Sequence, residues 1–273
     1  MSGAEHPTKS MAVKDDPKGI RIGPVTAMAE FERCVEVQLA VWGYSDGDLI
    51  PKRVFIVADR IGGQVIGAFD QDLLVGFAMA LPGYRDGKPY LHSHMLAVLP
   101  EYRNRGLGRR LKLAQRDDAL ARGFDRMEWT FDPLEIKNAH LNLVRLGAIV
   151  RRYIRDFYGP STSLLQGGLP TDRLVAEWWL RSARVRRILG EDGPGEEMAQ
   201  TAVAPDGIVE RVAVPYEIHN WKRNPEQRKL AEQLQASIRL ALESAFARGL
   251  AITGYERAPN GDGCFLLGPV TGL

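Results

Sequence analysis

One stretch near the middle of the chain, residues 91–111, joins an apolar strand pattern to a short turn, a glycine-containing loop and the start of a helix. The loop, residues 103–108, reads Arg-Asn-Arg-Gly-Leu-Gly. Glycines let the backbone approach a ligand closely, and the first amides of a helix are unpaired donors at the positive end of its dipole. This stretch therefore predicts a binding site for a phosphate or pyrophosphate group.

Two other phosphate-binding motifs do not fit this stretch. A P-loop requires a lysine followed by Ser or Thr after its last glycine, and none follows Gly108. A dinucleotide-binding fingerprint requires a third glycine, but position 111 is leucine. An ordinary strand-to-helix turn is the remaining alternative.

The spacing Arg-x-x-Gly-x-Gly, after the strand pattern of residues 94–98, resembles motif A of the GNAT superfamily of acyl-CoA-dependent N-acyltransferases. Hydrophobic periodicity predicts the element order β-α-α-β-β-β-α-β-α-β from residue 20 to residue 158, which is the order of that family. The resemblance implies an α/β (α+β) fold whose mixed sheet is splayed between its fourth and fifth strands. Those strands are predicted at residues 90–98 and 127–131.

The same resemblance assigns the residues that would hold an acyl-CoA. Pantetheine contacts are expected from Leu96, Ala97 and Val98. The pyrophosphate is expected to be bound by Arg103, Asn104, Arg105, Gly106, Leu107, Gly108 and Arg109, chiefly through backbone amides. Asn138 and Asn142, at i and i+4 of a predicted helix, resemble the asparagine of the family that contacts the cofactor. Helix capping is the alternative for Asn138.

The helix that follows the glycine loop carries apolar residues at helical spacing. Its expected core residues are Leu107, Leu111, Leu113, Ala114 and Ala121. Gly123 is expected to end this helix.

Two histidines, His92 and His94, lie at i and i+2 of the predicted strand, so their side chains share one side. Histidine has an ordinary pKa of about 6.5 and can carry a proton in the neutral range. The segment His-x-His-x-Leu-Ala-Val is similar to that of serotonin N-acetyltransferase, a GNAT in which two histidines relay the proton of the amine, and this resemblance makes both residues candidate catalysts. The alternatives are histidines hydrogen-bonded at a strand edge, or substrate contacts without proton transfer. No cysteine or paired acid supports a zinc site from these residues and His140.

The general acid is left unassigned. In many GNATs a tyrosine before the Leu-Gly-Ala segment protonates the departing thiolate, and the equivalent position here is Leu143. Tyr153 and Tyr158 are alternative donors, although packing is the simpler interpretation of both. Asp132 and Glu135 follow the strand beside the expected cleft, where they either meet the substrate amine or form a turn.

The chain is predicted to contain four parts. Residues 1–19 form a tail, 20–190 the GNAT domain, 191–206 a linker, and 207–273 a small C-terminal β-α-β-β extension. This extension is too small to be stable alone, so it is expected to pack on the first domain or across a homodimer.

Composition excludes several other classes of protein. The net charge of +2 gives no general attraction to nucleic acid or acidic membranes. The apolar runs are much shorter than the roughly 20 residues of a membrane span. The first residues of the sequence contain no hydrophobic segment of the kind that a signal peptide requires. We therefore expect a cytoplasmic protein with no nucleic-acid or membrane partner. Cys34 and Cys264 are expected to be buried, reduced thiols.

The sequence thus predicts an N-acyltransferase that moves an acetyl or other short acyl group, succinyl included, from acyl-CoA to a primary amine. The amine, most simply a small molecule, would attack directly in a ternary complex, without a metal. Two alternatives remain: a protein that binds acyl-CoA without turnover, and a regulatory or scaffold protein on the same fold.

Overall fold

The computed structural model describes residues 14–15, 19–44, 47–163, 166–191 and 207–270. The strands are β1 (Lys14–Asp15), β2 (Ile20–Pro24), β3 (Gln64–Asp70), β4 (Leu73–Arg85), β5 (Lys88–Val98), β6 (Arg126–Phe131), β7 (Ile149–Ile154), β8 (Arg173–Trp179), β9 (Glu210–Val214), β10 (Ala251–Arg257) and β11 (Gly263–Gly268). The α-helices are α1 (Met28–Trp42), α2 (Lys52–Arg60), α3 (Leu107–Ala121), α4 (Ile136–His140), α5 (Ala183–Leu189), α6 (Ile218–Trp221) and α7 (Arg228–Ala247). Three single-turn helices complete the described elements: η1 (Pro100–Tyr102), the π-helix η2 (Leu141–Arg145) and η3 (Pro225–Gln227).

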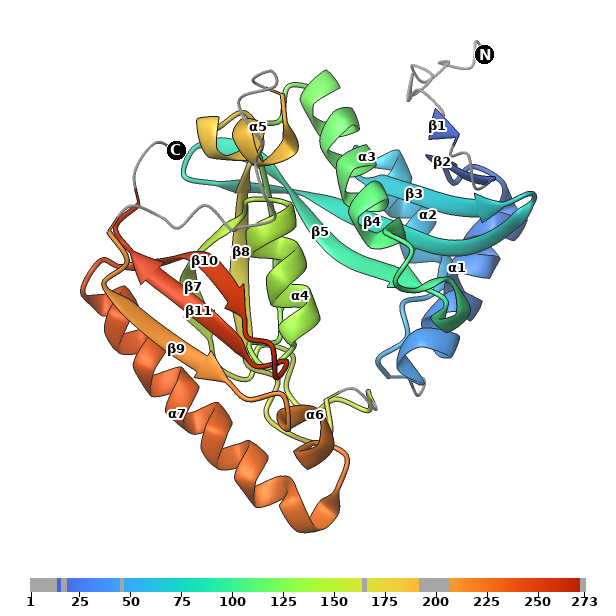
Figure 1. Cartoon of the computed structure of the whole chain (residues 1–273). Helices are drawn as coiled ribbons and strands as arrows, with labels where there is room; N and C mark the ends of the chain where they lie inside the picture. Colours follow the sequence, from blue (N-terminus) through green and yellow to red (C-terminus); the bar gives the residue numbers. More distant parts are fainter. Residues whose placement is uncertain (1–13, 16–18, 45–46, 164–165, 192–206, 271–273) are drawn as a thin grey trace, which may run out of the picture.

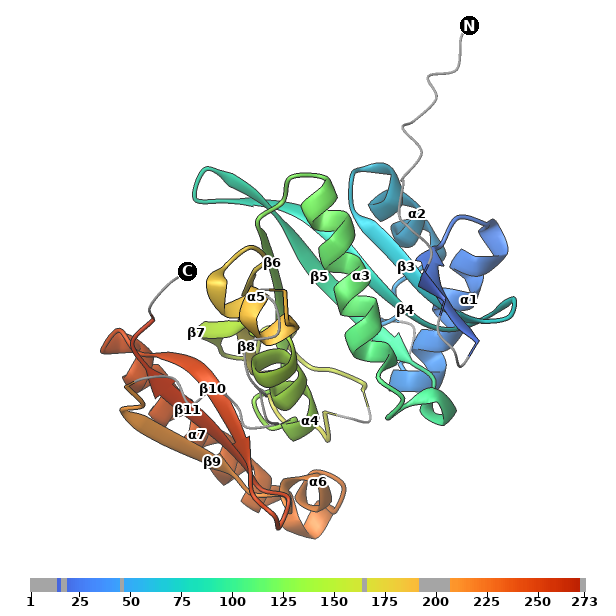
Figure 2. The ribbon, with the colours of Figure 1, turned by 45° about the horizontal axis from the view of Figure 1, so that its top comes forward.

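All these strands belong to one sheet, in the order β1-β2-β3-β4-β5-β6-β8-β7-β10-β11-β9. Neighbouring strands are antiparallel except β5 and β6, which are parallel. The parallel pair is joined at only two positions, Leu91 with Met127 and His92 with Glu128. Beyond them the two strands diverge (Figure 2), which is the splay expected between the fourth and fifth strands of the predicted domain.

The first half of the sheet packs between helices. Helix α3 crosses one face of β3, β4 and β5, and α1 and α2 cover the other (Figure 1). Strands β3 and β4 are buried on both faces, and their sequences are accordingly almost continuously apolar. Phe55 of α2 meets Phe77 of β4 edge-to-face, with ring centroids 5.4 Å apart. Burial of this apolar surface fixes the first half as a rigid platform.

The second half has a separate core around Trp178 of β8, whose ring meets Trp129 of β6 edge-to-face at 5.8 Å. The C-terminal strands continue this half of the sheet, because Ile252 of β10 pairs with Val150 of β7. Helix α7 lies along the strands of the C-terminal region (Figure 1). Its buried residues recur at helical spacing: Ala231, Gln235, Ile238, Leu242 and Ala245. The extension is therefore joined to the rest of the chain by both a strand pair and an apolar helix face.

Two elements, β7 and α6, differ from the sequence prediction. Strand β7 ends at Ile154 instead of continuing to residue 158, and Asp156 adopts a positive φ of 42° in the turn that follows. Helix α6 was not predicted, because four residues are too few for a periodic pattern. Most of the predicted tail, residues 1–13 and 16–18, and residues 192–206 of the predicted linker lie outside the described residues.

The buried face of α3 also differs from the prediction. Leu107 and Leu111 are buried as expected, but Ala121 is exposed. Three polar residues are buried instead: Lys112, Gln115 and Arg116. They lie on the side of α3 that faces the diverging strands. On that side they contact polar groups of the protein instead of solvent.

Both cysteines are free thiols; Cys34 is fully buried and Cys264 is half-buried. Among the described residues, no helix is both long enough and apolar enough to cross a membrane.

Candidate active site

The divergence of β5 from β6 leaves the backbone of β5 beyond His92 without a strand partner on that side among the described residues. On its other side β5 pairs with β4, where Met79 opposes Met95 and the next residue, Ala80, opposes Ser93. His94 is therefore the extra residue of a β-bulge. Bulges are frequent beside active sites because they redirect a side chain out of the regular alternation.

The glycine loop lies at the N-terminus of α3. Gly106 has a φ of 78°, no heavy atom lies within 4 Å of the position of an added Cβ, and no side chain caps the helix. Asn104 also adopts a positive φ, 60°. The loop is thus an exposed turn that presents backbone amides beside a helix N-terminus, as the sequence predicted for an anion site.

The four arginines of this segment have different surroundings. Arg103 donates to the carbonyl oxygen of Val98 at 3.2 Å, and Arg110 donates to that of Ile20 at 2.7 Å, so both are used within the fold. The guanidinium of Arg105 lies over the ring of Tyr102 at 5.2 Å. Arg109 is half-buried, and burial together with the charge of Arg145 lowers its pKa. Arg105 is the arginine best placed to meet an anion, followed by Arg109 of α3, which also donates to the carbonyl oxygen of Arg145 at 3.4 Å.

A cavity of about 460 Å³ lies between the diverging strands. We call its two sides the first wall and the second wall. The first wall consists of cavity residues within 42–50, of residues 93–96 on β5, and of Lys112 on α3. The second wall consists of residues 129–132 on β6, of four residues within 135–142, and of Tyr158, Ser161, Ser163, Gln166 and Arg173.

The structure brings three of the twelve predicted cofactor residues to this cavity. Leu96, Asn138 and Asn142 line it, and Gly108 lies beside it, since an added Cβ there would be 3.6 Å from the side chain of Leu96. The side chains of Ala97 and Val98 do not line the cavity, so only their backbone groups could meet a ligand. Asn142 lies in the π-helix, a distortion that is frequent at functional sites.

The two histidines lie close together, with ring centroids 6.0 Å apart. His94 lines the cavity and His92 does not. Burial, followed by the positive charges of His94, Lys112 and Arg85, lowers the pKa of His92 to about 4. Burial also lowers the pKa of His94. Both imidazoles are therefore neutral at pH 7 and able to accept a proton.

Lys112 is a cavity residue that sequence reasoning missed. Only 3% of it is exposed, and its Nζ donates to Ser93 Oγ at 2.7 Å. The same Nζ lies 3.6 Å from the centroid of the Trp129 ring. The only sequence signal is the spacing of Lys112, Gln115 and Arg116 on one face of α3, which is also typical of a solvent-exposed stripe.

The acidic residues of the second wall are paired. Lys222, which directly follows α6, donates to Asp132 Oδ2 at 2.9 Å and to Glu135 Oε1 at 3.0 Å. Burial lowers the pKa of Lys222, but the two carboxylates outweigh it, so the pKa lies above its usual value. Asp132 also accepts from the amide of Leu134 at 2.8 Å, so the expected turn is present together with the ion pair.

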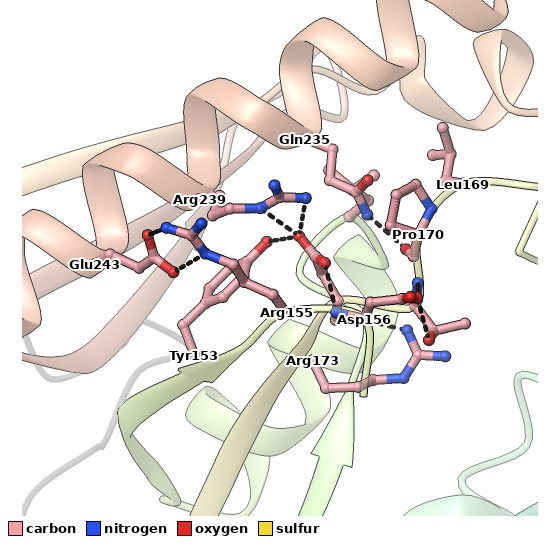
Figure 3. A network of polar contacts seen from close by, with 12 residues as sticks. Tyr153, Arg155, Asp156, Leu169, Pro170, Arg173, Gln235, Arg239 and Glu243 are labelled. Atoms are coloured by element: carbon pink, nitrogen blue, oxygen red, sulfur yellow. Dashed lines mark hydrogen bonds and ion pairs between the residues drawn. The ribbon is translucent and has the colours of Figure 1, made fainter. Parts of the chain in front are cut away.

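The loop that completes the second wall is held by α7 (Figure 3). Gln235 donates to the carbonyl oxygen of Pro170 at 2.9 Å, and Arg239 contacts Asp172 at 2.7 Å. Tyr153 donates to the same carboxylate at 2.6 Å. One end of this network reaches the cavity, because Arg173 donates to Gln166 Oε1 at 3.1 Å.

The three positions considered for a general acid, Leu143, Tyr153 and Tyr158, have different surroundings. Leu143 is 1% exposed, packs in the core and does not line the cavity. Tyr153 is bound to Asp172 outside the cavity, and burial raises its pKa. Tyr158 lines the cavity, is 46% exposed and has its hydroxyl 3.0 Å from Thr130 Oγ1. Within the described ranges, no group of three or more His, Cys, Asp or Glu side chains could hold a metal.

Residues 31–143 match the acetyltransferase (GNAT) family, a segment that contains β3 to β6, the glycine loop and both histidines. Three solved structures resemble the chain. An acetyltransferase of the GNAT family from Desulfovibrio desulfuricans is 12% identical, with a TM-score of 0.48 over 59% of this chain and 99% of that chain. The ribosomal-protein-S18-alanine N-acetyltransferase from Escherichia coli is 16% identical, with a TM-score of 0.46 over 58% and 92%. Naa50 from Arabidopsis thaliana is 15% identical, with a TM-score of 0.46 over 58% and 97%.

A search of curated proteins finds no match. Because the TM-scores lie below 0.5, the assignment rests on the family match and on the splayed sheet. The matched segment, residues 31–143, belongs to the GNAT acetyltransferase family. The fold of the chain is the GNAT fold, extended at the C-terminus, and the family match supports an acyltransferase in general terms.

Proposed function

We propose that the protein is an N-acyltransferase that transfers an acetyl or other short acyl group from acyl-CoA to a primary amine. The observation that carries this proposal is the arrangement of the site. A cavity lies between the splayed strands β5 and β6, an exposed glycine loop lies at the N-terminus of α3, and a bulge directs His94 into the cavity.

The residues present fit an acyl-CoA. The amides of residues 104–109 would hold the pyrophosphate, with side-chain contacts from Arg105 and Arg109, and Arg103 would support the loop through its bond to Val98. The backbone of Leu96, Ala97 and Val98 would hold the pantetheine arm, because β5 has no strand partner among the described residues on the cavity side there. Asn138 and Asn142 would contact the arm from the second wall. When bound, the thioester supplies the activated acyl group.

His94 is the group that accepts the proton of the amine. The amine must be neutral to attack, and an amine in water at pH 7 is mostly protonated. His94 is neutral, buried and at the cavity, which are the properties of a general base. His92, whose ring centroid lies 6.0 Å from that of His94, is the second proton carrier.

Direct attack in a ternary complex agrees with the composition of the cavity. Neither Cys34 nor Cys264 lines it, and burial raises the pKa of both thiols, so neither is an activated nucleophile. The acceptor would enter beside the second wall, where Tyr158, Ser161 and Arg173 offer aromatic and polar contacts. A small-molecule amine fits a cavity of about 460 Å³. The division into a domain of residues 20–190 and an extension from residue 207 belongs to this proposal.

Calorimetric titration of the full chain with acetyl-CoA, succinyl-CoA and free CoA tests the proposal. We expect micromolar affinity that depends on the acyl group, followed by CoA release when a panel of primary amines is added. The absence of binding to all three would contradict the proposal. Binding without turnover of any amine would favour a protein that only holds acyl-CoA.

A further inference from the structure

One cavity residue, Lys112, has no role in the function proposed above, and that function leaves one role unfilled. As the acyl group transfers, the CoA sulfur departs as a thiolate and benefits from a proton donor. Leu143 stands where the family resemblance places a tyrosine, and it is buried in the core. The donor must therefore come from another element.

Lys112 lies on the first wall together with His94. Its contacts are a hydroxyl oxygen, Ser93 Oγ at 2.7 Å, and the face of Trp129 at 3.6 Å. Ser93 Oγ in turn donates to Gln115 Oε1 at 2.9 Å, so its lone pairs are free to accept from the lysine. No carboxylate of the described residues lies within 4 Å of Nζ. The Nζ of this cavity-lining residue thus has no counter-charge within 4 Å among the described residues.

The other buried cations of the chain are different. Lys222 binds two carboxylates, and Arg116 binds Glu191 together with the carbonyl oxygen of Leu180. Burial of a cation is costly unless it is paired, and both of these residues follow that rule. Lys112 is more buried than Lys222, yet it has only a dipole and an aromatic face. A structural role accounts for the paired cations, whereas Lys112 lines the cavity.

We propose that Lys112 is the general acid that protonates the departing CoA thiolate, an inference that rests on the proposed function. The amine nitrogen bonds to the thioester carbonyl carbon, and its proton passes to His94. The carbon–sulfur bond then breaks, its electron pair remains on sulfur, and sulfur takes a proton from Lys112 Nζ. Lys112 is left neutral and His94 protonated. Before the next turnover, a proton passes through solvent from the His94 imidazolium to the neutral side chain of Lys112.

The environment of Lys112 suits proton donation. Burial lowers the pKa of Lys112 well below its ordinary value, so the ammonium gives up its proton more readily than an exposed lysine. The alternative donor on the cavity is Tyr158, whose hydroxyl meets Thr130 and which is far more exposed. The two candidates lie on opposite walls, so single substitutions separate them.

The first test needs neither a donor nor an acceptor. NMR titration of the full chain with ¹³C-labelled lysine ε-carbons, with the Lys112→Met variant to assign the signal, gives the pKa of Lys112 directly. We expect it to lie at least about 1 pH unit below the pKa values of the other lysines and above the assay pH, because a lysine that is already neutral would have no proton to donate and would also overturn the proposal. An ordinary lysine pKa would overturn the proposal, because such an ammonium holds its proton too tightly.

The second test compares turnover and binding in Lys112→Met, Lys112→Arg and Tyr158→Phe, with the exposed Lys137→Met as control. We expect both Lys112 variants to lower kcat by about 10²-fold or more, since guanidinium keeps the charge but cannot release a proton. Their acyl-CoA dissociation constants should match the wild type, and the loss of kcat of the wild type at alkaline pH should be absent in Lys112→Met.

Three results would contradict the assignment. Full activity of Lys112→Arg would show that only the charge matters, as in binding a carboxylate of the substrate. A change in KM alone would lead to the same conclusion. Loss of kcat in Tyr158→Phe, with Lys112→Met active, would move the role to the tyrosine. If the wild-type protein binds no acyl-CoA, the proposed function fails, and the NMR titration still decides whether Lys112 can release a proton.

Discussion

The two walls of the cavity are built in different ways. The first wall takes its reacting groups from β5 and α3, within 20 residues of one another, and its glycine loop lies between them. The second wall depends on partners far away in the chain: Lys222 is 90 positions from Asp132, and Arg239 is 67 from Asp172. Local segments thus carry the groups that we propose to react, and distant segments hold the surface that we propose to face the acceptor.

The largest expected effect belongs to the first wall. The double variant His92→Ala, His94→Ala should lower kcat by about 10²–10⁴-fold, the usual contribution of a general base, and leave the acyl-CoA dissociation constant unchanged. Both pKa values are lowered, so the wild-type imidazoles stay neutral as pH falls below 6.5, and that of His92 becomes protonated only toward pH 4. The rate should therefore decline only in that acid range, and the variant should lack the decline.

A pH–rate profile with single-turnover kinetics measures this effect. The sequence alone predicted a decline in the neutral range, and burial shifts the expectation to lower pH. A wild-type midpoint near 6.5, or an unchanged profile in the double variant, would remove both histidines from catalysis.

Lys222→Met should produce the largest loss of stability in the second wall. Removing one partner of a buried ion pair leaves Asp132 and Glu135 uncompensated and costs about 3–5 kcal/mol of unfolding free energy. The pKa of Lys222 is raised in the folded state. Its contribution to the free energy of unfolding is therefore complete below the unfolded-state pKa of about 10.4, and it is lost as pH rises through the folded-state pKa. Denaturant unfolding of wild type and variant between pH 7 and pH 11 measures both effects.

The matched control is Lys229→Met, an exposed lysine of α7, which should change neither the stability nor its alkaline dependence. Equal stability of Lys222→Met and wild type would mean that the second wall does not need this ion pair.

Gly106→Val tests the loop of the first wall. A β-branched side chain at a φ of 78° is strained, and it occupies the open side of the turn that the pyrophosphate would approach. We expect acyl-CoA affinity to fall by about 100-fold, which equals about 2.7 kcal/mol. Gly123→Val is the control, since Gly123 has a φ of 81° and equally open surroundings at the other end of α3. Calorimetry should show normal affinity in the control; equal losses in both variants would indicate a general effect of strain.

Arg239→Met should have the smallest measurable effect. The fully buried Asp172 would keep the hydroxyl of Tyr153 but lose its cation, at a cost of about 1–3 kcal/mol. Looser packing of the loop should raise KM for the amine while the acyl-CoA dissociation constant stays constant. Arg155→Ala, in the same network but at an exposed pair, should leave the melting temperature unchanged. Equal changes of both substrate constants in Arg239→Met would contradict the separation of the two walls.

The sequence predicted the first wall well because its signals are local. The glycine spacing after β5, the alternating strand and the two histidines are readable within 20 residues, and the structure confirms the splay beside them. The roles of these residues stay predictions. The bulge at His94 was not predictable, because it depends on how β4 and β5 pair.

The second wall could be predicted only in part. Asp132 and Glu135 were recognised as neighbours of the cleft, but their partner directly after α6 comes from a segment with no distinctive pattern. Lys112 was missed for another reason. A lysine between Leu111 and Leu113 of an amphipathic helix normally points to solvent, and only the diverging strands turn that face of α3 into a cavity.

The pairing of β10 with β7 has a consequence for the order in which the molecule forms during synthesis. The platform of β2 to β5 and α1 to α3 is complete once about 120 residues have left the ribosome, and its contacts are mostly between neighbouring elements. The edge of β7 stays open until β10 emerges about 100 residues after it. Nascent chains should therefore acquire the glycine loop early and a closed acceptor surface last, a sequence of events that puts acyl-CoA binding ahead of catalytic competence.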